Sequence, residues 1–140
     1  HKALTRYTNN WNIGFGMDLT LCAYNPKNKK LTYSGISNPL YLIRDHKIHQ
    51  YSVNETAQTF NSGIFKYYCK DQSLKVKKGD YVYLSSDGFA DQFGQGNNKK
   101  YKRRRFRDLL LSIHQYPIEK QQKMLQQNFE QWKGNLPPNR

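Results

Sequence analysis

The chain has 140 residues, a formal net charge of +13, a sequence pI near 9.8 and a mean hydropathy of −0.96. This length is sufficient for one domain that buries roughly 70% of its unfolded surface. The low hydropathy and the lack of a long apolar run exclude a transmembrane span in these residues, and they show no signal peptide. The excess of cations raises nucleic acid or an anionic membrane as possible partners.

The cysteine usage points to a reducing compartment. Cys22 and Cys69 are far apart, lie in strand-like runs and have no Cys-x-x-Cys partner. This spacing indicates neither a zinc site nor a disulfide framework. We therefore expect two buried free thiols and a cytoplasmic location.

The first part of the chain predicts antiparallel strands joined by short turns. The predicted strands are residues 19–24, 31–34, 40–44, 47–51, 64–70, 73–76 and 81–85. Turn residues separate them: 25–28 by composition, Asp45-His46 as a two-residue hairpin loop, and Asp71-Gln72. We expect successive strands to pair as a meander. The polar stretch 53–62 lacks either periodicity and is predicted to be a loop, and Asn38 before Pro39 is expected to be a turn former whose amide ties strands together.

The last part of the chain predicts two helices that pack on the sheet. The first has apolar positions at Phe106, Leu109, Leu110 and Ile113. The second starts after Pro117, which suits a helix start, and Gly134 suits its C-terminal cap. Its apolar face is formed by Met124, Leu125, Phe129 and Trp132. The predicted fold class is therefore α+β, with antiparallel strands followed by two helices.

The run 77–94 concentrates the candidate chemistry. Gly79-Asp80 is a turn, residues 81–85 alternate like a half-buried strand, and Asp87-Gly88 ends that strand where a loop leaves the sheet. Asp-Gly alone is a common turn. In this longer string, however, Asp87 is held at the edge of a sheet, where a carboxylate can bind a metal ion.

This run resembles the SpoIIE/RsbU-like branch of the bacterial PPM-type metal-dependent serine/threonine phosphatases. In that family a Gly-Asp, a hydrophobic strand and a Ser-Asp-Gly supply an active-site metal ligand, a role that falls on Asp87. Other stretches agree in order and spacing. They are Gly-Met-Asp-Leu-Thr-Leu-Cys-Ala-Tyr at 16–24, Tyr-Ser-Gly-Ile-Ser-Asn-Pro-Leu-Tyr-Leu-Ile-Arg at 33–44, Phe-Arg-Asp-Leu-Leu-Leu at 106–111 and Trp-Lys-Gly-Asn-Leu at 132–136.

The chain also departs from the family pattern. It has no Gly-His-Gly segment, no pair of aspartates follows Gly-Asn-Leu at 134–136, and Phe15 stands where the family usually has an Asp. We therefore interpret residues 1–140 as the C-terminal portion of a SpoIIE-like PPM-type phosphatase domain, incomplete at both ends. The resemblance implies an α-β-β-α sandwich, of which this chain supplies part of both sheets and the second helical layer.

The resemblance further implies the activity and its cofactors. The intact parent would hydrolyse phosphoserine or phosphothreonine in a bacterial signalling partner, using two Mg²⁺ or Mn²⁺ ions, whereas this chain alone would be inactive. Asp87 is the one metal ligand we name, and no catalytic side chain is assigned. Asp18 is expected either to support the metal ligands from behind or to lie in an exposed turn. Asp91 is expected either to orient a metal-bound water or to cap the loop through hydrogen bonds to backbone amides. An upstream sensory or regulatory domain, and a membrane anchor within such a segment, are compatible with this interpretation.

Three further hypotheses concern partners. The basic run 99–107 most simply solvates a loop and a helix start. Second, beside a metal site it could attract a phosphorylated acidic partner, and nucleic acid ranks third. The rival to the enzyme is a non-catalytic phosphatase-like interaction module, and an incomplete sandwich predicts self-association. His46, His49 and His114 lack metal-ligand spacing, and the first two are predicted to lie on an exposed hairpin.

Overall fold

The computed structural model describes residues 20–35, 38–52, 56–59, 65–68, 71–96 and 98–138. Within them the chain forms eight strands and three helices. The strands are β1 (Thr20–Asn25), β2 (Lys30–Gly35), β3 (Leu40–Arg44), β4 (Lys47–Tyr51), β5 (Thr56–Thr59), β6 (Phe65–Tyr68), β7 (Gln72–Lys75) and β8 (Tyr81–Leu84). The helices are α2 (Gly88–Asp91), α3 (Arg103–Ile113) and α4 (Ile118–Lys133).

The strands form two three-stranded antiparallel sheets and a separate β5-β6 pair. The first sheet has the order β1-β2-β7 and the second β4-β3-β8. The two predicted hairpins, β1-β2 and β3-β4, are confirmed. The turn between β3 and β4 has positive φ at both Asp45 (48°) and His46 (58°), as a two-residue turn that follows the twist of the strands requires.

The meander prediction is wrong beyond these hairpins. The predicted pair 64–70 and 73–76 does not form, because β6 pairs with β5 and β7 pairs with β2. β8 then crosses to the second sheet and pairs with β3. Periodicity identifies a strand but not its partner, and β2 offers β7 the apolar Leu31 opposite Leu74. The stretch 53–62, predicted to be a loop, contains β5.

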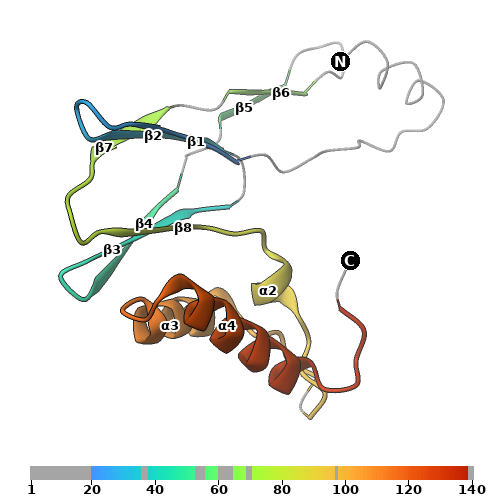
Figure 1. Cartoon of the computed structure of the whole chain (residues 1–140). Coiled ribbons are helices and arrows are strands. Elements are labelled where there is room, and N and C mark those ends of the chain that lie inside the picture. The colour runs from blue at the N-terminus through green and yellow to red at the C-terminus, as the bar shows by residue number, and fades with distance from the viewer. Residues whose placement is uncertain are drawn as a thin grey trace.

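The two sheets lie face to face, and the helices cover the outer side of the second sheet (Figure 1). Between the sheets, Leu31 and Tyr33 of β2 pack with Leu40 and Leu42 of β3. The alternation of side chains along a strand explains the layers, since Tyr41 of β3 points to the other face. The architecture is therefore sheet, sheet, helices.

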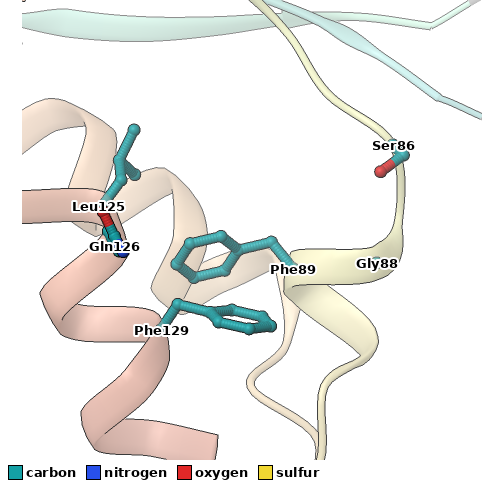
Figure 2. Close-up of a pocket in the computed structure, with 6 residues that line it drawn as sticks. All are labelled: Ser86, Gly88, Phe89, Leu125, Gln126 and Phe129. Carbon is teal, nitrogen blue, oxygen red and sulfur yellow. The ribbon is translucent and has the colours of Figure 1, made fainter. Parts of the chain in front are cut away.

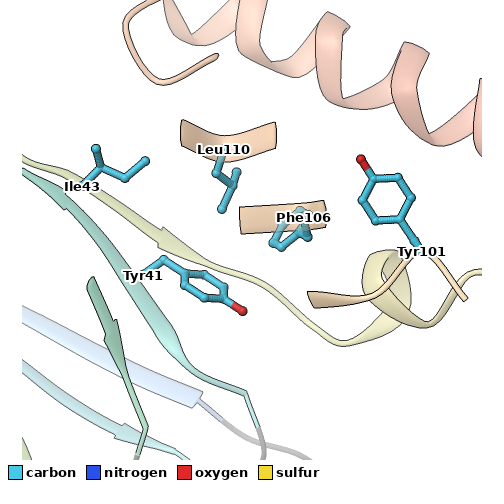
Figure 3. Packing of buried hydrophobic residues seen from close by; sticks show 5 residues of the cluster. All are labelled: Tyr41, Ile43, Tyr101, Phe106 and Leu110. Carbon is cyan, nitrogen blue, oxygen red and sulfur yellow. The ribbon is translucent and has the colours of Figure 1, made fainter. Parts of the chain in front are cut away.

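The helices dock on the second sheet through an aromatic and aliphatic core (Figure 3). Its buried members are Tyr41, Ile43, Tyr101, Phe106 and Leu110. Phe106 and Leu110 are four residues apart and so share one face of α3. Tyr41 meets the ring of Phe106 edge to face at 6.1 Å between centroids. Burial of such side chains stabilises the fold by about 2 kcal/mol each.

Local signals set the bounds of α4. Pro117 occupies its N-cap, and the Pro117 carbonyl accepts hydrogen bonds from the amides of Lys120 and Gln121. Gly134 caps the other end with φ +58°, a backbone conformation that glycine adopts without a steric cost. The two predicted helices are thus confirmed, and α2 is an additional one-turn helix.

Two further findings concern exposure. Cys22 is exposed on β1, so its predicted burial is wrong: β1 is an edge strand of its sheet, with one neighbour among the described strands. Cys69 lies outside the described residues. None of the helices within the described ranges combines the length and apolar character that a membrane crossing needs.

Candidate functional site

Asp87 lies where the chain leaves the second sheet and turns into α2. β8 ends at Leu84, the chain continues through Ser85 and Ser86, and Asp87 takes the N-cap position of α2. The Asp87 carbonyl accepts a hydrogen bond from the Asp91 amide at 2.9 Å. Asp87 thus follows the end of a strand, as predicted, but a one-turn helix takes the place of the predicted loop.

Side chains from three elements hold this turn in place. Phe89 packs against Tyr101, Phe106 and Phe129 with ring centroids 5.0, 4.9 and 5.1 Å away. Its neighbour Ala90 is buried, and the Ala90 carbonyl accepts a hydrogen bond from the Lys102 amide at 2.7 Å. Strand β8 holds the chain before Asp87, and this cluster holds the chain after it. The Asp87 backbone is therefore held in place from both directions.

The carboxylate of Asp87 is available to a ligand. Asp87 is exposed and makes no side-chain capping hydrogen bond to α2. Within the described part of the chain, no hydrogen bond or ion pair engages its side chain. Hard cations such as Mg²⁺ and Mn²⁺ prefer carboxylate oxygens, so Asp87 fits the role of one such ligand.

Asp87 has no acidic partners that would complete a metal site among the described residues. There, no three His, Cys, Asp or Glu side chains come together as a candidate metal group. Asp91 is one helical turn away, but its carboxylate lies 3.1 Å from the Lys100 ammonium group. Asp91 is thus an ion-pair partner in this structure.

An apolar pocket of about 440 Å³ opens beside this turn, between α2 and α4 (Figure 2). Phe89 and Phe129 face each other within it, and Leu125 lies further along α4. Ser86 and Gly88 border the pocket on the side of Asp87. A group bound at Asp87 would therefore have an apolar surface next to it.

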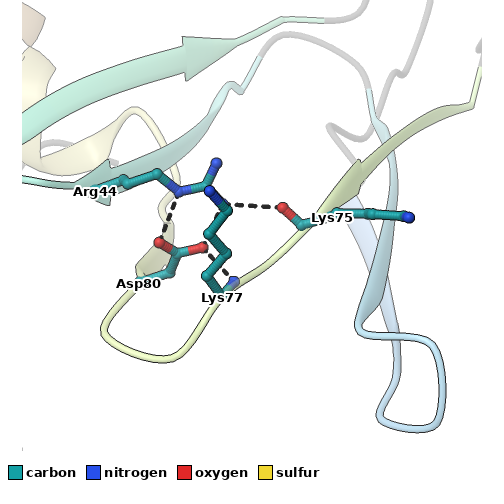
Figure 4. A network of polar contacts seen from close by, with 4 residues as sticks. All are labelled: Arg44, Lys75, Lys77 and Asp80. Carbon is teal, nitrogen blue, oxygen red and sulfur yellow. Dashed lines mark hydrogen bonds and ion pairs between the residues drawn. The ribbon is translucent and has the colours of Figure 1, made fainter.

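An ion pair at the other end of β8 anchors this strand (Figure 4). The Arg44 guanidinium group donates to both carboxylate oxygens of Asp80, at 2.9 and 2.6 Å. Arg44 also donates to the Lys75 carbonyl, and the Lys77 amide donates to Asp80. The hydrogen bond from Arg44 lowers the pKa of Asp80, and the Lys77 amide lowers it further, while burial opposes the shift.

Asp80 and Arg44 entered the sequence patterns only as parts of motifs, and their pairing was not predicted. The two strings contain residues of opposite charge: Arg44 ends the string 33–44, and Asp80 is the fourth residue of the run 77–94. Without the β3-β8 pairing, however, nothing in the sequence places them together. Their contact joins the end of β3 to the turn before β8 and thereby sets the path that leads to Asp87.

The remaining candidate residues have other places. Asp18 lies outside the described residues. His46 and His49 are exposed on the β3-β4 hairpin, as predicted, and His46 packs against the buried His114 at 5.5 Å between ring centroids. Asn38 accepts a hydrogen bond from the Tyr33 hydroxyl through its backbone carbonyl, so a main-chain group provides this tie to β2.

The comparisons with known proteins agree with the geometry. The family model of stage II sporulation protein E (SpoIIE) matches residues 2–138. No curated protein matches the chain closely enough to count as a relative.

Solved structures share the fold at low sequence identity. The SiaA-PP2C domain of Pseudomonas aeruginosa aligns with a TM-score of 0.75 and 20% identity, over 96% of this chain and 52% of that one. The phosphatase domain of the cell fate determinant SpoIIE from Bacillus subtilis aligns with a TM-score of 0.64 and 13% identity, over 99% and 60%. The structure of the same domain presoaked with Mn aligns with a TM-score of 0.63 and 11% identity, over 88% of this chain and 52% of that one. The chain thus spans between half and two thirds of the length of these structures, and the predicted α+β fold is confirmed.

Proposed function

The chain belongs to the stage II sporulation protein E (SpoIIE) family, and we propose that it is the C-terminal portion of a metal-dependent protein-serine/threonine phosphatase domain. The domain would remove phosphate from phosphoserine or phosphothreonine of a signalling protein. The observation that carries the proposal is the exposed carboxylate of Asp87 at the end of β8, on a fold shared with phosphatase domains.

Asp87 would be one ligand of two Mg²⁺ or Mn²⁺ ions in the intact domain. Such ions lower the pKa of a bound water and neutralise phosphoryl oxygens. Phosphomonoester hydrolysis is very slow without catalysis. This chain would supply one carboxylate ligand, Asp87, in a fixed position. The pairing of β8 with β3 and the packing of Phe89 support that position. The other ligands would come from residues beyond those described.

The test is Asp87→Asn in the intact parent domain, measured as turnover against Mn²⁺ concentration. Asn preserves the size of the side chain but removes the negative charge that a hard cation requires, so metal affinity and turnover should collapse together. The fold should survive, and thermal unfolding without metal should be unchanged or slightly higher, because repulsion among clustered carboxylates is relieved.

Asp91→Asn is the matched control, since it removes a carboxylate one helical turn away. It loses the ion pair with Lys100, which is exposed and contributes below about 1 kcal/mol. Turnover should therefore change little. Near-normal turnover of Asp87→Asn at saturating Mn²⁺ would contradict the assignment of Asp87. An inactive parent would favour a non-catalytic interaction module instead, and metal-independent turnover would contradict the proposed metal site.

A further inference from the structure

A strongly basic surface lies beside the candidate site. It consists of cationic side chains from the loop before α3 and from the first turn of that helix. We name it the basic surface: Lys99, Lys100, Lys102, Arg103, Arg104 and Arg105, all exposed. Together they account for six of the 23 lysines and arginines of the chain within seven consecutive positions. The net charge of +13 is therefore concentrated in part at one place.

Direct contacts connect the basic surface to the turn that carries Asp87. The Lys100 ammonium group pairs with Asp91 at 3.1 Å. The Lys102 amide donates to the Ala90 carbonyl at 2.7 Å. Asp91 and Asp87 are in turn joined by a main-chain hydrogen bond of α2. The basic surface thus contacts Asp91, which lies one turn of α2 after Asp87.

The N-terminus of α3 adds to the positive potential of the basic surface. α3 has no acidic residue in its first turn, where three arginines follow one another. A helix N-terminus carries a partial positive charge, so cations there destabilise the helix and anions stabilise it. Arg105 also stacks over the Trp132 ring, 4.6 Å from its centroid. An anionic partner would relieve the repulsion among these side chains.

The aromatic residues favour an acidic polypeptide over nucleic acid as this partner. Proteins that bind single strands offer exposed aromatic rings on which bases stack. Here Tyr101 and Phe106, which lie within the same segment, are both 6% exposed, and the Trp132 ring is covered by Arg105. Arg and Lys side chains without such rings suit carboxylates and phosphate groups.

We propose that the basic surface binds the acidic segment that flanks the phosphorylated residue of a protein substrate. This inference rests on the proposed phosphatase function. It adds the chemistry of the substrate: a phosphopeptide with several Asp or Glu residues near the phosphorylated side chain. The contact of Lys100 with Asp91 places these carboxylates next to the residue to be dephosphorylated.

Binding is measured by fluorescence anisotropy on the full 140-residue chain without metal, so the readout does not depend on activity. The probe is a labelled peptide with one phosphoserine followed by an Asp/Glu-rich segment. A second peptide keeps the phosphoserine and replaces the acids with Asn and Gln. The acidic peptide should bind at least about tenfold more tightly than its neutral counterpart.

The double variant Lys102→Glu/Arg104→Glu tests the surface itself. Acidic residues at the start of α3 favour the helix, so weaker binding would not reflect unfolding. The matched control is Lys27→Glu/Lys78→Glu, which makes the same change of charge at two exposed turns. Lys78 lies before β8 and Asp87 lies after it, so the two residues are at opposite ends of this strand. The first variant should lose about tenfold or more in affinity, and the control should change little.

Three outcomes would overturn the inference: equal binding of both peptides, equal loss in both variants, or tighter binding of a duplex DNA of matched charge with a steep salt dependence. If the peptide does not bind but the intact parent hydrolyses phosphoserine, only this inference fails. If the peptide binds but the parent is inactive, the phosphatase proposal fails.

Discussion

Arg44 and Asp80 form a two-point ion pair that joins the end of β3 to the turn before β8. The Asp80 side chain is 4% exposed, and its two oxygens accept from Arg44 at 2.9 and 2.6 Å. Such paired contacts between a guanidinium group and a carboxylate fix geometry as well as contributing energy. The pair therefore holds the start of β8, and β8 carries the chain to Asp87.

Replacing Asp80 with Asn should destabilise the fold by about 1–3 kcal/mol, because the Arg44 guanidinium group loses the buried carboxylate that accepts its two hydrogen bonds. The pKa of Asp80 is lowered in the folded chain from its ordinary value of 3.8. Its stabilising effect is therefore complete above that value and is lost as the pH falls toward the folded pKa. Urea unfolding between pH 7 and pH 2.5 would show this loss.

The control for Asp80→Asn is Asp71→Asn, since Asp71 is exposed. It should change the free energy of unfolding by less than about 0.5 kcal/mol. If both variants unfold at the same urea concentration at pH 7, the Arg44 pair does not stabilise β8.

Gly94 allows a close approach of the Trp132 ring. A Cβ atom at position 94 would lie 2.8 Å from Cε2 of Trp132 and 3.0 Å from Cζ2. The ring is held by its hydrogen bond to the Gln92 carbonyl, so it is not free to move away. Gly94→Ala should cost about 1–3 kcal/mol of stability. Gly96→Ala is the control, because a Cβ there meets nothing within 4 Å. Thermal unfolding of both would compare them.

Tyr83 should titrate well above an ordinary tyrosine. Burial raises its pKa to about 12, and the nearby Tyr81 adds to the shift, while its hydroxyl donates to Gln121 at 2.9 Å. Because the folded pKa exceeds the unfolded value of about 10, this contribution to stability is complete below pH 10 and is lost as the pH rises toward 12. Tyr83→Phe should remove that alkaline dependence from unfolding curves, and an identical dependence in the variant would contradict the assignment.

The chain alone should show negligible phosphatase activity. Asp87 by itself cannot hold two divalent ions against water. An assay with a chromogenic phosphomonoester in excess Mn²⁺ checks this prediction. Robust metal-dependent turnover by these 140 residues would contradict the interpretation that the chain is part of a larger catalytic domain.

The chain should also self-associate above micromolar concentrations. Val82 and Leu84 face the same side of the second sheet as Leu40 and Leu42, yet they are 37% and 44% exposed. Tyr24, on the edge strand β1, is 54% exposed. Apolar surface beside an open strand edge promotes pairing between chains.

Sedimentation velocity over a range of concentrations measures this association. Val82→Thr/Leu84→Gln should weaken it, because the variant removes apolar surface and keeps β8 intact. The control is Ile118→Gln, which changes one residue of α4 that is 67% exposed. It should not weaken the association. A chain that stays monomeric at all concentrations would rule out the association.

Local signals were sufficient to predict several elements from the sequence. Asp45-His46 specifies its hairpin because two residues suffice to reverse the chain. The bounds of α4 follow from Pro117 and Gly134, which act within one turn of the helix ends. Asp87 could be located at the end of a strand for the same reason, since the alternation of residues 81–85 and the following Gly88 lie next to it.

Contacts between distant segments depend on how the whole chain packs. The sequence did not show that β7 pairs with β2 and β8 with β3, because strands of similar pattern compete for the same partners and the choice depends on packing of the whole core. The exposure of Cys22 and the pair of Arg44 with Asp80 follow from that choice. The packing of α4 decides the fit of Gly94 against Trp132. The same holds for the contact of Lys100 with Asp91, which brings the basic surface to the candidate metal ligand.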